Sequence, residues 1–206
     1  MRPILKLDEK EYSFKTYSII LFLIGAPLLS FFLILFFNLE INNWTREIIA
    51  KQTVFILNQF FGMETQTIFN NDEWILIIPR LEKNLIISLW CTSFHIISIF
   101  ISVIIFIPHS QEYTSRKDIN IRKTKALTIL IAIVYIGNLI RLILFLYLTN
   151  IGFPWDSTHL FINYLTGFLA AILFILILYF WLPEIFISIY YIPSLISYKR
   201  KMKKKV

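Results

Sequence analysis

The chain has little charge and only one cysteine. Lys, Arg, Asp and Glu together make up 16% of its 206 residues, whereas soluble domains carry about 25% of such residues. Hydrophobic residues make up 57% of the chain, so the composition excludes an ordinary soluble domain and indicates an integral membrane protein. The lone Cys91 excludes an internal disulfide.

Several signatures of known chemistry are also missing from the sequence. It has no paired metal ligands at typical spacing, no glycine-rich phosphate loop and no serine nucleophile elbow. We therefore expect no metal and no cofactor. The net charge of +7 does not indicate nucleic-acid binding, because the excess basic residues lie in the terminal segments and one short loop, where membrane topology explains them.

Four apolar runs are long enough to cross a bilayer, which takes about 20 residues. They cover residues 17–37, 85–107, 126–148 and 160–182. The apolar stretch 184–197 is short and contains Pro193, so we expect an interfacial helix there, with a fifth span as the less favoured alternative. The expected fold is an all-α integral membrane bundle of about four transmembrane helices.

Basic residues predict the orientation of these spans, because short loops rich in Lys and Arg stay on the cytoplasmic side. The loop 149–159 contains none. We therefore expect residues 1–16, 108–125 and 183–206 to be cytoplasmic and residues 39–84 and 149–159 to lie outside. The basic residues concerned are Arg2, Lys6, Lys10 and Lys15, then Arg116, Lys117, Arg122, Lys123 and Lys125, and finally Lys199, Arg200, Lys201, Lys203, Lys204 and Lys205.

The segment 39–84 is the only soluble part of any size. Residues 44–61 have apolar side chains at helical spacing, and Gly62 is a typical helix stop. Two short stretches, 65–69 and 74–78, flank Asn70-Asn71-Asp72, a sequence typical of a hairpin turn. We expect a small helix and hairpin cap on the outer membrane surface.

Three reactive side chains are expected at a similar depth near the outer face. Cys91 lies about six residues into the second span, or about 9 Å deep at 1.5 Å per residue. Arg141 lies about seven residues from the outer end of the third span, or about 10 Å deep. His159 lies at the outer mouth of the fourth span. Asn138 shares a helix face with Arg141, so its amide is expected to orient the guanidinium or to bind substrate backbone.

A thiol, a cation and an imidazole at one depth are the parts of a cysteine-nucleophile enzyme. Arg141 does not deprotonate, so its expected role is to stabilise the thiolate and the oxyanion of a tetrahedral intermediate. A histidine is the natural proton shuttle to a leaving amine. His159 is favoured for this role, and His95, one turn from Cys91 on the same face, is the rival.

Two interpretations without catalysis stay open. Cys91 could be a small core residue, and Arg141 could pair with Glu73 or Asp156 and hold the bundle together. The protein would then be a non-catalytic subunit of a membrane complex. A small transporter component with Arg141 on an anion path is less favoured, because the first and fourth spans offer few polar residues.

Three signatures occur in a characteristic order. They are Cys91-Thr92-Ser93, Asn138-Leu139-Ile140-Arg141, and His159 followed by Gly167. This order resembles that of the exosortase/archaeosortase family of membrane-embedded cysteine transpeptidases, with its Cys-Ser/Thr-Gly, its Asn-x-x-Arg and its histidine before a glycine-containing last span. The resemblance covers about residues 44–182, and Ser93 stands where the family usually has glycine.

The resemblance implies an enzyme of the cell membrane that processes secreted proteins at the extracytoplasmic face. Substrates of the family carry a C-terminal sorting signal with a short motif, an apolar helix and a basic tail. Cys91 would attack the carbonyl at the motif and form a thioester, and His159 would protonate the departing amine. An amine acceptor on a lipid or another surface carrier would then resolve the thioester, whereas water would give simple proteolysis.

Overall fold

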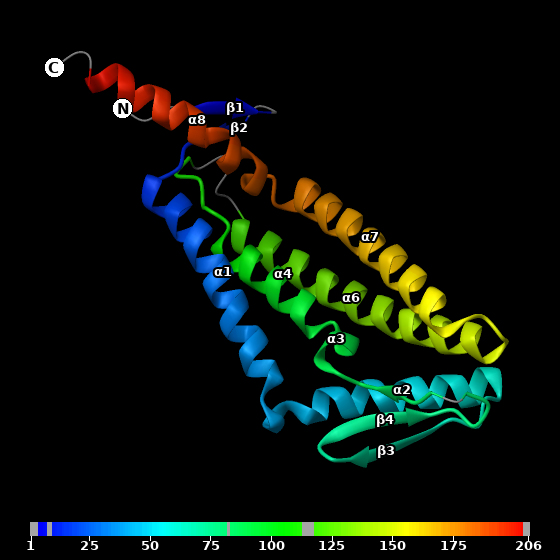
Figure 1. Ribbon diagram of the computed structural model, residues 1–206. Helices are drawn as coiled ribbons and strands as arrows, with labels where there is room; N and C mark the ends of the chain where they lie inside the picture. The colour runs from blue at the N-terminus through cyan, green and yellow to red at the C-terminus, as the bar shows by residue number, and fades with distance from the viewer. Residues whose placement is uncertain (1–3, 8–9, 82, 113–117, 204–206) are drawn as a thin grey trace. The chain divides into compact units, whose positions relative to one another are not determined.

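The computed structural model describes residues 4–7, 10–81, 83–112 and 118–203, and most of them are helical (Figure 1). Three helices are long and apolar enough to cross a membrane, which indicates a membrane protein. They are α1 (Thr16–Asn38), α6 (Ile119–Asn150) and α7 (Trp155–Trp181). The shorter elements are β1 (Leu5–Leu7), β2 (Lys10–Tyr12), η1 (Glu40–Asn42), α2 (Asn43–Phe61), β3 (Gln66–Asn70), β4 (Glu73–Ile77), β5 (Leu85–Ile86), α3 (Leu89–Thr92), α4 (Phe94–Phe106) and α8 (Glu184–Lys203).

The expectation of one continuous helix over 85–107 is wrong. Leu85 and Ile86 pair with β4 as strand β5, and α3 contains only four residues. Ser93 then adopts a left-handed conformation with φ of 57°, which ends α3. The remaining helix α4 has 13 residues, fewer than the roughly 20 that cross a bilayer unaided. An apolar run does not reveal this break, because the strand pairing that causes part of it involves residues elsewhere in the chain.

Other boundaries also differ from the expected ones. α6 begins at Ile119, inside the expected loop 108–125, and α8 continues to Lys203. α7 begins at Trp155, so His159 lies within a helix and not at the end of a loop. Residues 5–7 and 10–12 form the small antiparallel pair β1–β2, which the composition did not predict. Outside the described residues lie Arg2, Arg116, Lys117, Lys204 and Lys205 and the side chains of Lys6, Lys10, Lys199, Arg200, Lys201 and Lys203.

The chain divides into two compact units. The first unit comprises residues 1–30, 99–129 and 174–206, and the second unit comprises residues 31–98 and 130–173. Helices α1, α4, α6 and α7 each contribute residues to both units. All the residues of the candidate site belong to the second unit.

In the second unit, the helix and the hairpin predicted from the sequence are both present. α2 ends at Phe61, and Gly62 caps it with φ of 59° and a backbone N–H directed at the Asn58 carbonyl. Strands β3 and β4 pair antiparallel around Asn71 and Asp72, whose positive φ values fit a type I′ turn. A buried core joins α2, β4, α6 and α7; its members include Ile49, Leu57, Leu76, Leu146 and Ile162.

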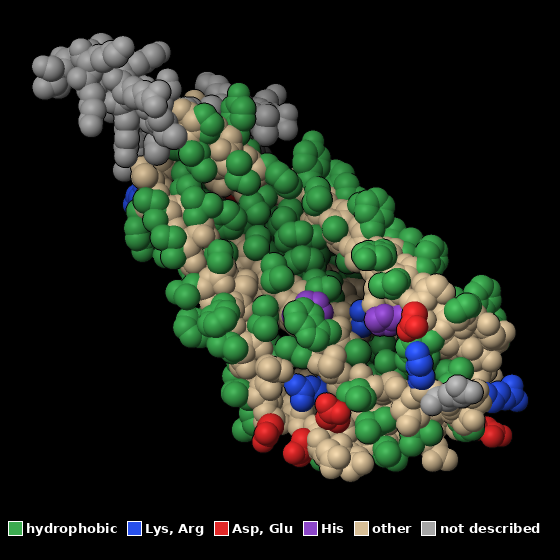
Figure 2. All heavy atoms as spheres, viewed as in Figure 1, with side chains coloured by type: hydrophobic (Ala, Val, Ile, Leu, Met, Phe, Trp, Pro, Cys, Tyr) green, Lys and Arg blue, Asp and Glu red, His purple; other side chains and the backbone are tan. Residues whose placement is uncertain are grey.

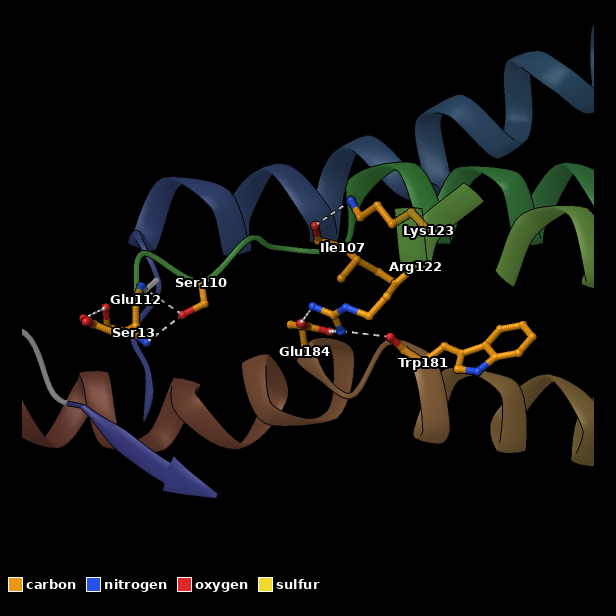
Figure 3. Close-up of polar contacts among 8 residues, drawn as sticks. All are labelled: Ser13, Ile107, Ser110, Glu112, Arg122, Lys123, Trp181 and Glu184. Atoms are coloured by element: carbon orange, nitrogen blue, oxygen red, sulfur yellow. Dashed lines mark hydrogen bonds and ion pairs between the residues drawn. The ribbon is translucent and has the colours of Figure 1, made fainter. Parts of the chain in front are cut away.

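In the first unit, a buried ion pair lies at the junction of three helices (Figure 3). Glu184, at the start of α8, is fully buried and accepts two bonds from Arg122 of α6, at 2.6 and 3.2 Å. Arg122 also donates to the Trp181 carbonyl at the end of α7 (2.9 Å). Beside it, Lys123 donates to carbonyls in the last turn of α4 and just after it, those of Ile105 and Ile107. Two basic residues used to predict topology therefore also join helix ends.

Apolar side chains cover the long helices, whereas charged side chains gather where α2, β3 and β4 lie (Figure 2). In α1 only 11% of the most apolar window is buried, and in α7 only 6%. Such exposure of large apolar side chains is unusual for a monomeric soluble protein and is the expected surface of helices in contact with lipid.

Candidate functional site

Cys91 lies in the short helix α3, directly after the strand β5 that pairs with β4. Its side chain is half-buried and packs against the core of the second unit. The Sγ atom accepts a hydrogen bond from the Ser88 hydroxyl and donates one to the Ile86 carbonyl, both at 3.6 Å. The thiol is thus held by groups of its own segment.

Asn138 of α6 holds the backbone of the same turn. Its Nδ2 donates to the Cys91 carbonyl at 2.6 Å, and its Oδ1 accepts from the Ser93 hydroxyl at 2.8 Å. Ser93 and Asn138 are both buried. The expected contact between the Asn138 amide and the Arg141 guanidinium is therefore replaced by contacts that fix the position of the cysteine.

Arg141 makes its hydrogen bonds to neutral groups. Its Nη2 donates to the Trp90 carbonyl (3.3 Å) and its Nη1 to Asn163 Oδ1 (3.2 Å). Its Nε is buried and lacks a hydrogen-bond partner within the described part of the chain. Asp156, one of the two carboxylates considered as its partner, lies 3.7 Å from Lys83 instead. The positive charge of Arg141 is therefore not neutralised by a described carboxylate.

The two candidate histidines occupy different places. His159 has Nε2 3.1 Å from Asn163 Nδ2 and packs edge-on against Phe145. His95 packs against the Trp90 ring at 4.5 Å, and its buried Nδ1 makes no hydrogen bond to a described residue. His159 is thus connected to Arg141 through Asn163, whereas His95 makes no hydrogen bond to Arg141 among the described residues.

Four of the five predicted residues fall into two groups connected by hydrogen bonds, and His95 belongs to neither group. Arg141, Asn163 and His159 form one chain of contacts, and Cys91, Asn138 and Ser93 form the other. The hydrogen bond from Arg141 to the carbonyl of Trp90, the residue before Cys91, connects the two groups. Among the described residues, neither histidine makes a hydrogen bond to the Cys91 thiol.

A cavity of about 420 Å³ adjoins these groups, and residues of α4, α6 and α7 line it. Its polar lining consists of Ser93, His95, Asn138, Arg141, Asn163 and Thr166, and the rest is apolar or glycine. Gly137 and Gly167 also line it, and a Cβ atom on either would meet no other atom within 4 Å. The cavity can therefore accept an apolar group with a hydrogen-bonding end.

Two residues of the site were not predicted from the sequence. Ser88 precedes Cys91 by three residues, a spacing that lets its hydroxyl reach the thiol within one helical turn. Asn163 follows His159 by four residues, on the same face of α7. In the sequence, each of these two residues could have been noticed as a polar residue one helical turn from a candidate site residue. Such spacing identifies a contact only when the neighbouring helix is known.

Neither a family model, nor a curated protein, nor a solved structure matches this chain. The part of the chain that the structure describes has no group of three or more His, Cys, Asp or Glu residues that could hold a metal ion. Function is therefore argued from the geometry around Cys91 and from the motifs themselves.

Proposed function

We propose that this protein is a membrane-embedded cysteine transpeptidase similar to the exosortases and archaeosortases. One observation carries the proposal: Asn138 and Arg141 bind the consecutive carbonyls of Cys91 and Trp90. The spacing of an Asn-x-x-Arg motif places both side chains on one helix face, and that face here positions the cysteine. A cysteine that only fills space in the core would not need two side chains to fix its backbone, so this arrangement favours a functional role for Cys91.

The conformation of Ser93 also supports the resemblance. Ser93 has φ of 57°, and this left-handed region is one that glycine enters without steric penalty. The family usually has glycine at the matching position of its Cys-Ser/Thr-Gly motif. The backbone here thus has the conformation that explains the family's preference, although this chain carries serine.

The surroundings of Cys91 favour a reactive thiol. A positive charge about 4 Å from a thiolate stabilises it by about 4 kcal/mol at an effective dielectric constant of 20. Arg141, which binds the carbonyl of the residue before Cys91, would supply a positive charge near the thiol, and no described carboxylate is bound to it. The Ser88 hydroxyl, which already donates to Sγ, would remain a donor to the thiolate.

In the proposed reaction, the Cys91 thiolate attacks the carbonyl carbon at the sorting motif of a secreted protein. The C–N bond then breaks, the apolar helix and basic tail leave as an amine, and the acyl group stays on sulfur as a thioester. Arg141 stabilises the oxyanion, and His159, with His95 as the rival, gives the leaving amine its proton. A second amine then attacks the thioester and releases the thiolate.

The proposed placement in the membrane follows the charge of the loops. α4 would complete a bundle of four spans, both termini would be cytoplasmic, and residues 39–84 would form a cap on the outer surface. The cavity of about 420 Å³ would then receive the outer end of the substrate's apolar helix from the side. Asn138 and Arg141, which hold the backbone around Cys91, line this cavity and support such lateral entry.

Labelling of the single cysteine tests the proposal. We expect a membrane-impermeant thiol reagent to modify Cys91 in intact cells at neutral pH, and we expect Arg141→Ala to slow this reaction strongly. Cys91→Ala should abolish processing of a secreted protein with a C-terminal sorting signal. Inert Cys91 in both proteins, labelling only from the cytoplasmic side, or full processing by Cys91→Ala would instead support a non-catalytic subunit of a membrane complex.

A further inference from the structure

A second cavity, of about 360 Å³, lies beside the segment that leads into Cys91. It is lined by residues 86–90, by Asn38 and Arg46, and by Asn71, Asp72 and Glu73 of the hairpin. It shares no lining residue with the cavity described above, whose lining begins at Ser93. Cys91 thus lies in the sequence between the two stretches that line the two cavities.

This second cavity is lined by both residues that contact the thiol. The two oxygen atoms that contact Cys91 Sγ belong to Ile86 and Ser88, and both residues line the cavity. A molecule bound there would therefore lie against the segment that holds Cys91. A ping-pong enzyme accepts first a donor and then an acceptor, and the apolar cavity suits the donor's apolar helix.

The charges of this cavity are of both signs and are not paired with one another. Asp72 and Glu73 supply two exposed carboxylates. Arg46 is bound by the side-chain oxygens of Asn43 and Asn38, and its buried Nε has no described partner. No ion pair joins Arg46 to Asp72 or Glu73 within 4 Å among the residues that the structure describes. The cavity therefore offers one site for a cation and another for an anion.

Trp90 adds an aromatic surface to the cation site. Its side chain lines the cavity and is 65% exposed. The face of an indole attracts an ammonium group at distances within about 6 Å of the ring centre. Two carboxylates and an indole together favour an ammonium ion over a neutral polar group.

We propose that this cavity is the acceptor site and that the acceptor is a zwitterion, a primary ammonium group joined to an anionic group. This inference rests on the proposed transpeptidase function. Asp72, Glu73 and Trp90 bind the ammonium group, and the Arg46 guanidinium, which lines the same cavity, binds the anion. The amine attacks the thioester carbonyl after losing one proton to water. The C–N bond forms, the C–S bond breaks, and a second proton from nitrogen goes to Sγ, which restores the Cys91 thiol.

Protection of Cys91 from a small thiol reagent tests the site without a sorting-signal substrate. The probe is O-phosphoethanolamine, added to the full chain in detergent, with ethanolamine and inorganic phosphate as its two halves. We expect O-phosphoethanolamine to slow labelling in a saturable way and each half to do so only at much higher concentration. A parallel arm uses vesicles of phosphatidylcholine with or without phosphatidylethanolamine, and protection only by the latter would identify a lipid headgroup as the source.

Charge-removing variants locate the effect. Arg46→Gln and Glu73→Gln should each raise the half-saturating concentration about tenfold or more, as expected for loss of a hydrogen bond to a charged group. The matched controls Arg80→Gln and Glu64→Gln remove exposed charges that do not line the cavity. They should leave the half-saturating concentration of the probe unchanged. Absence of protection by both the soluble probe and the lipid, or equal protection in all four variants, would overturn the acceptor site.

The outcome separates this inference from the proposed function. If Cys91→Ala still processes a sorting signal, the transpeptidase proposal fails, whatever the protection experiment shows. If processing requires Cys91, Glu73→Gln should still form the thioester and release it to water, but should transfer less of it to O-phosphoethanolamine. Unchanged transfer in Glu73→Gln would refute the acceptor site and leave the nucleophile assignment intact.

Discussion

Ser93 offers a prediction in which two small substitutions differ in their expected effect on stability. Ser93 is 5% exposed, has φ of 57°, and donates a hydrogen bond of 2.8 Å to Asn138. A left-handed conformation costs a residue with a Cβ atom about 1–2 kcal/mol, and glycine avoids this cost. A hydrogen bond contributes about 0.5–1.5 kcal/mol, and leaving a buried partner unsatisfied costs about 1–3 kcal/mol.

These magnitudes predict the order of stability. Ser93→Gly relieves the backbone conformation and loses the hydrogen bond, so its free energy of unfolding should stay within about 1 kcal/mol of the unchanged protein. Ser93→Ala loses the same bond and keeps the strained backbone, so it should be destabilised by about 1–3 kcal/mol. Glycine should therefore be the better replacement by about 1–2 kcal/mol.

The matched control is Ser98, which is fully buried within α4 and donates to the Phe94 carbonyl. In a regular helix, alanine is more favourable than glycine by about 1 kcal/mol, so Ser98→Ala should be more stable than Ser98→Gly. The assay is reversible unfolding in mixed micelles of dodecyl sulfate and a non-ionic detergent, followed by circular dichroism. If Ser93→Ala proved as stable as Ser93→Gly, α3 and α4 would form one continuous helix and the account of the cysteine turn would be refuted.

Two further predictions concern the partners of buried charges. Asn163→Ala removes the side chain that lies between Arg141 and His159. We expect this variant to slow thiol labelling of Cys91 less than Arg141→Ala does, because Arg141 keeps its hydrogen bond to the Trp90 carbonyl. Equal rates in Asn163→Ala and the unchanged protein would contradict that positioning role. Glu184→Gln removes the buried negative charge that pairs with Arg122 and should cost about 3–5 kcal/mol of unfolding free energy. Glu47→Gln breaks an exposed pair and should cost less than about 1 kcal/mol. The same micelle assay measures both, and similar losses would argue against a structural role for the buried pair.

Local signals in the sequence predict much of the secondary structure. Gly62 ends α2 because it adopts the left-handed cap, and Asn71-Asp72 forms the hairpin turn because both residues tolerate positive φ. Hydropathy locates α1, α6 and α7, since each is apolar over a length that crosses a bilayer. The break at Ser93 is not predictable in this way, because it depends on strand pairing with β4 and on the contact with Asn138.

The candidate site is predictable only in part for the same physical reason. Cys91 can be singled out because it is the only cysteine of the chain, and Arg141 because it is a charged residue within an apolar run. Helical spacing places Asn138 beside Arg141, but it does not show what lies opposite. The partners expected for the Asn138 amide were therefore the guanidinium or substrate backbone, and not the Cys91 carbonyl. Ser88 contacts the thiol and Asn163 contacts the guanidinium because of the orientation of their helical turns. A single sequence does not reveal this orientation.

The break in the helix explains why an arginine can lie in this apolar part of the chain. A helix leaves its last carbonyls without intrahelical partners, and α3 ends one turn after it begins. The carbonyls of Trp90 and Cys91 are therefore free to accept bonds from Arg141 and Asn138. An arginine bound by a carbonyl and an amide is held in place without pairing with a carboxylate. The same break that shortens the second apolar helix thus supplies the acceptor that holds a positive charge at the residue before the cysteine.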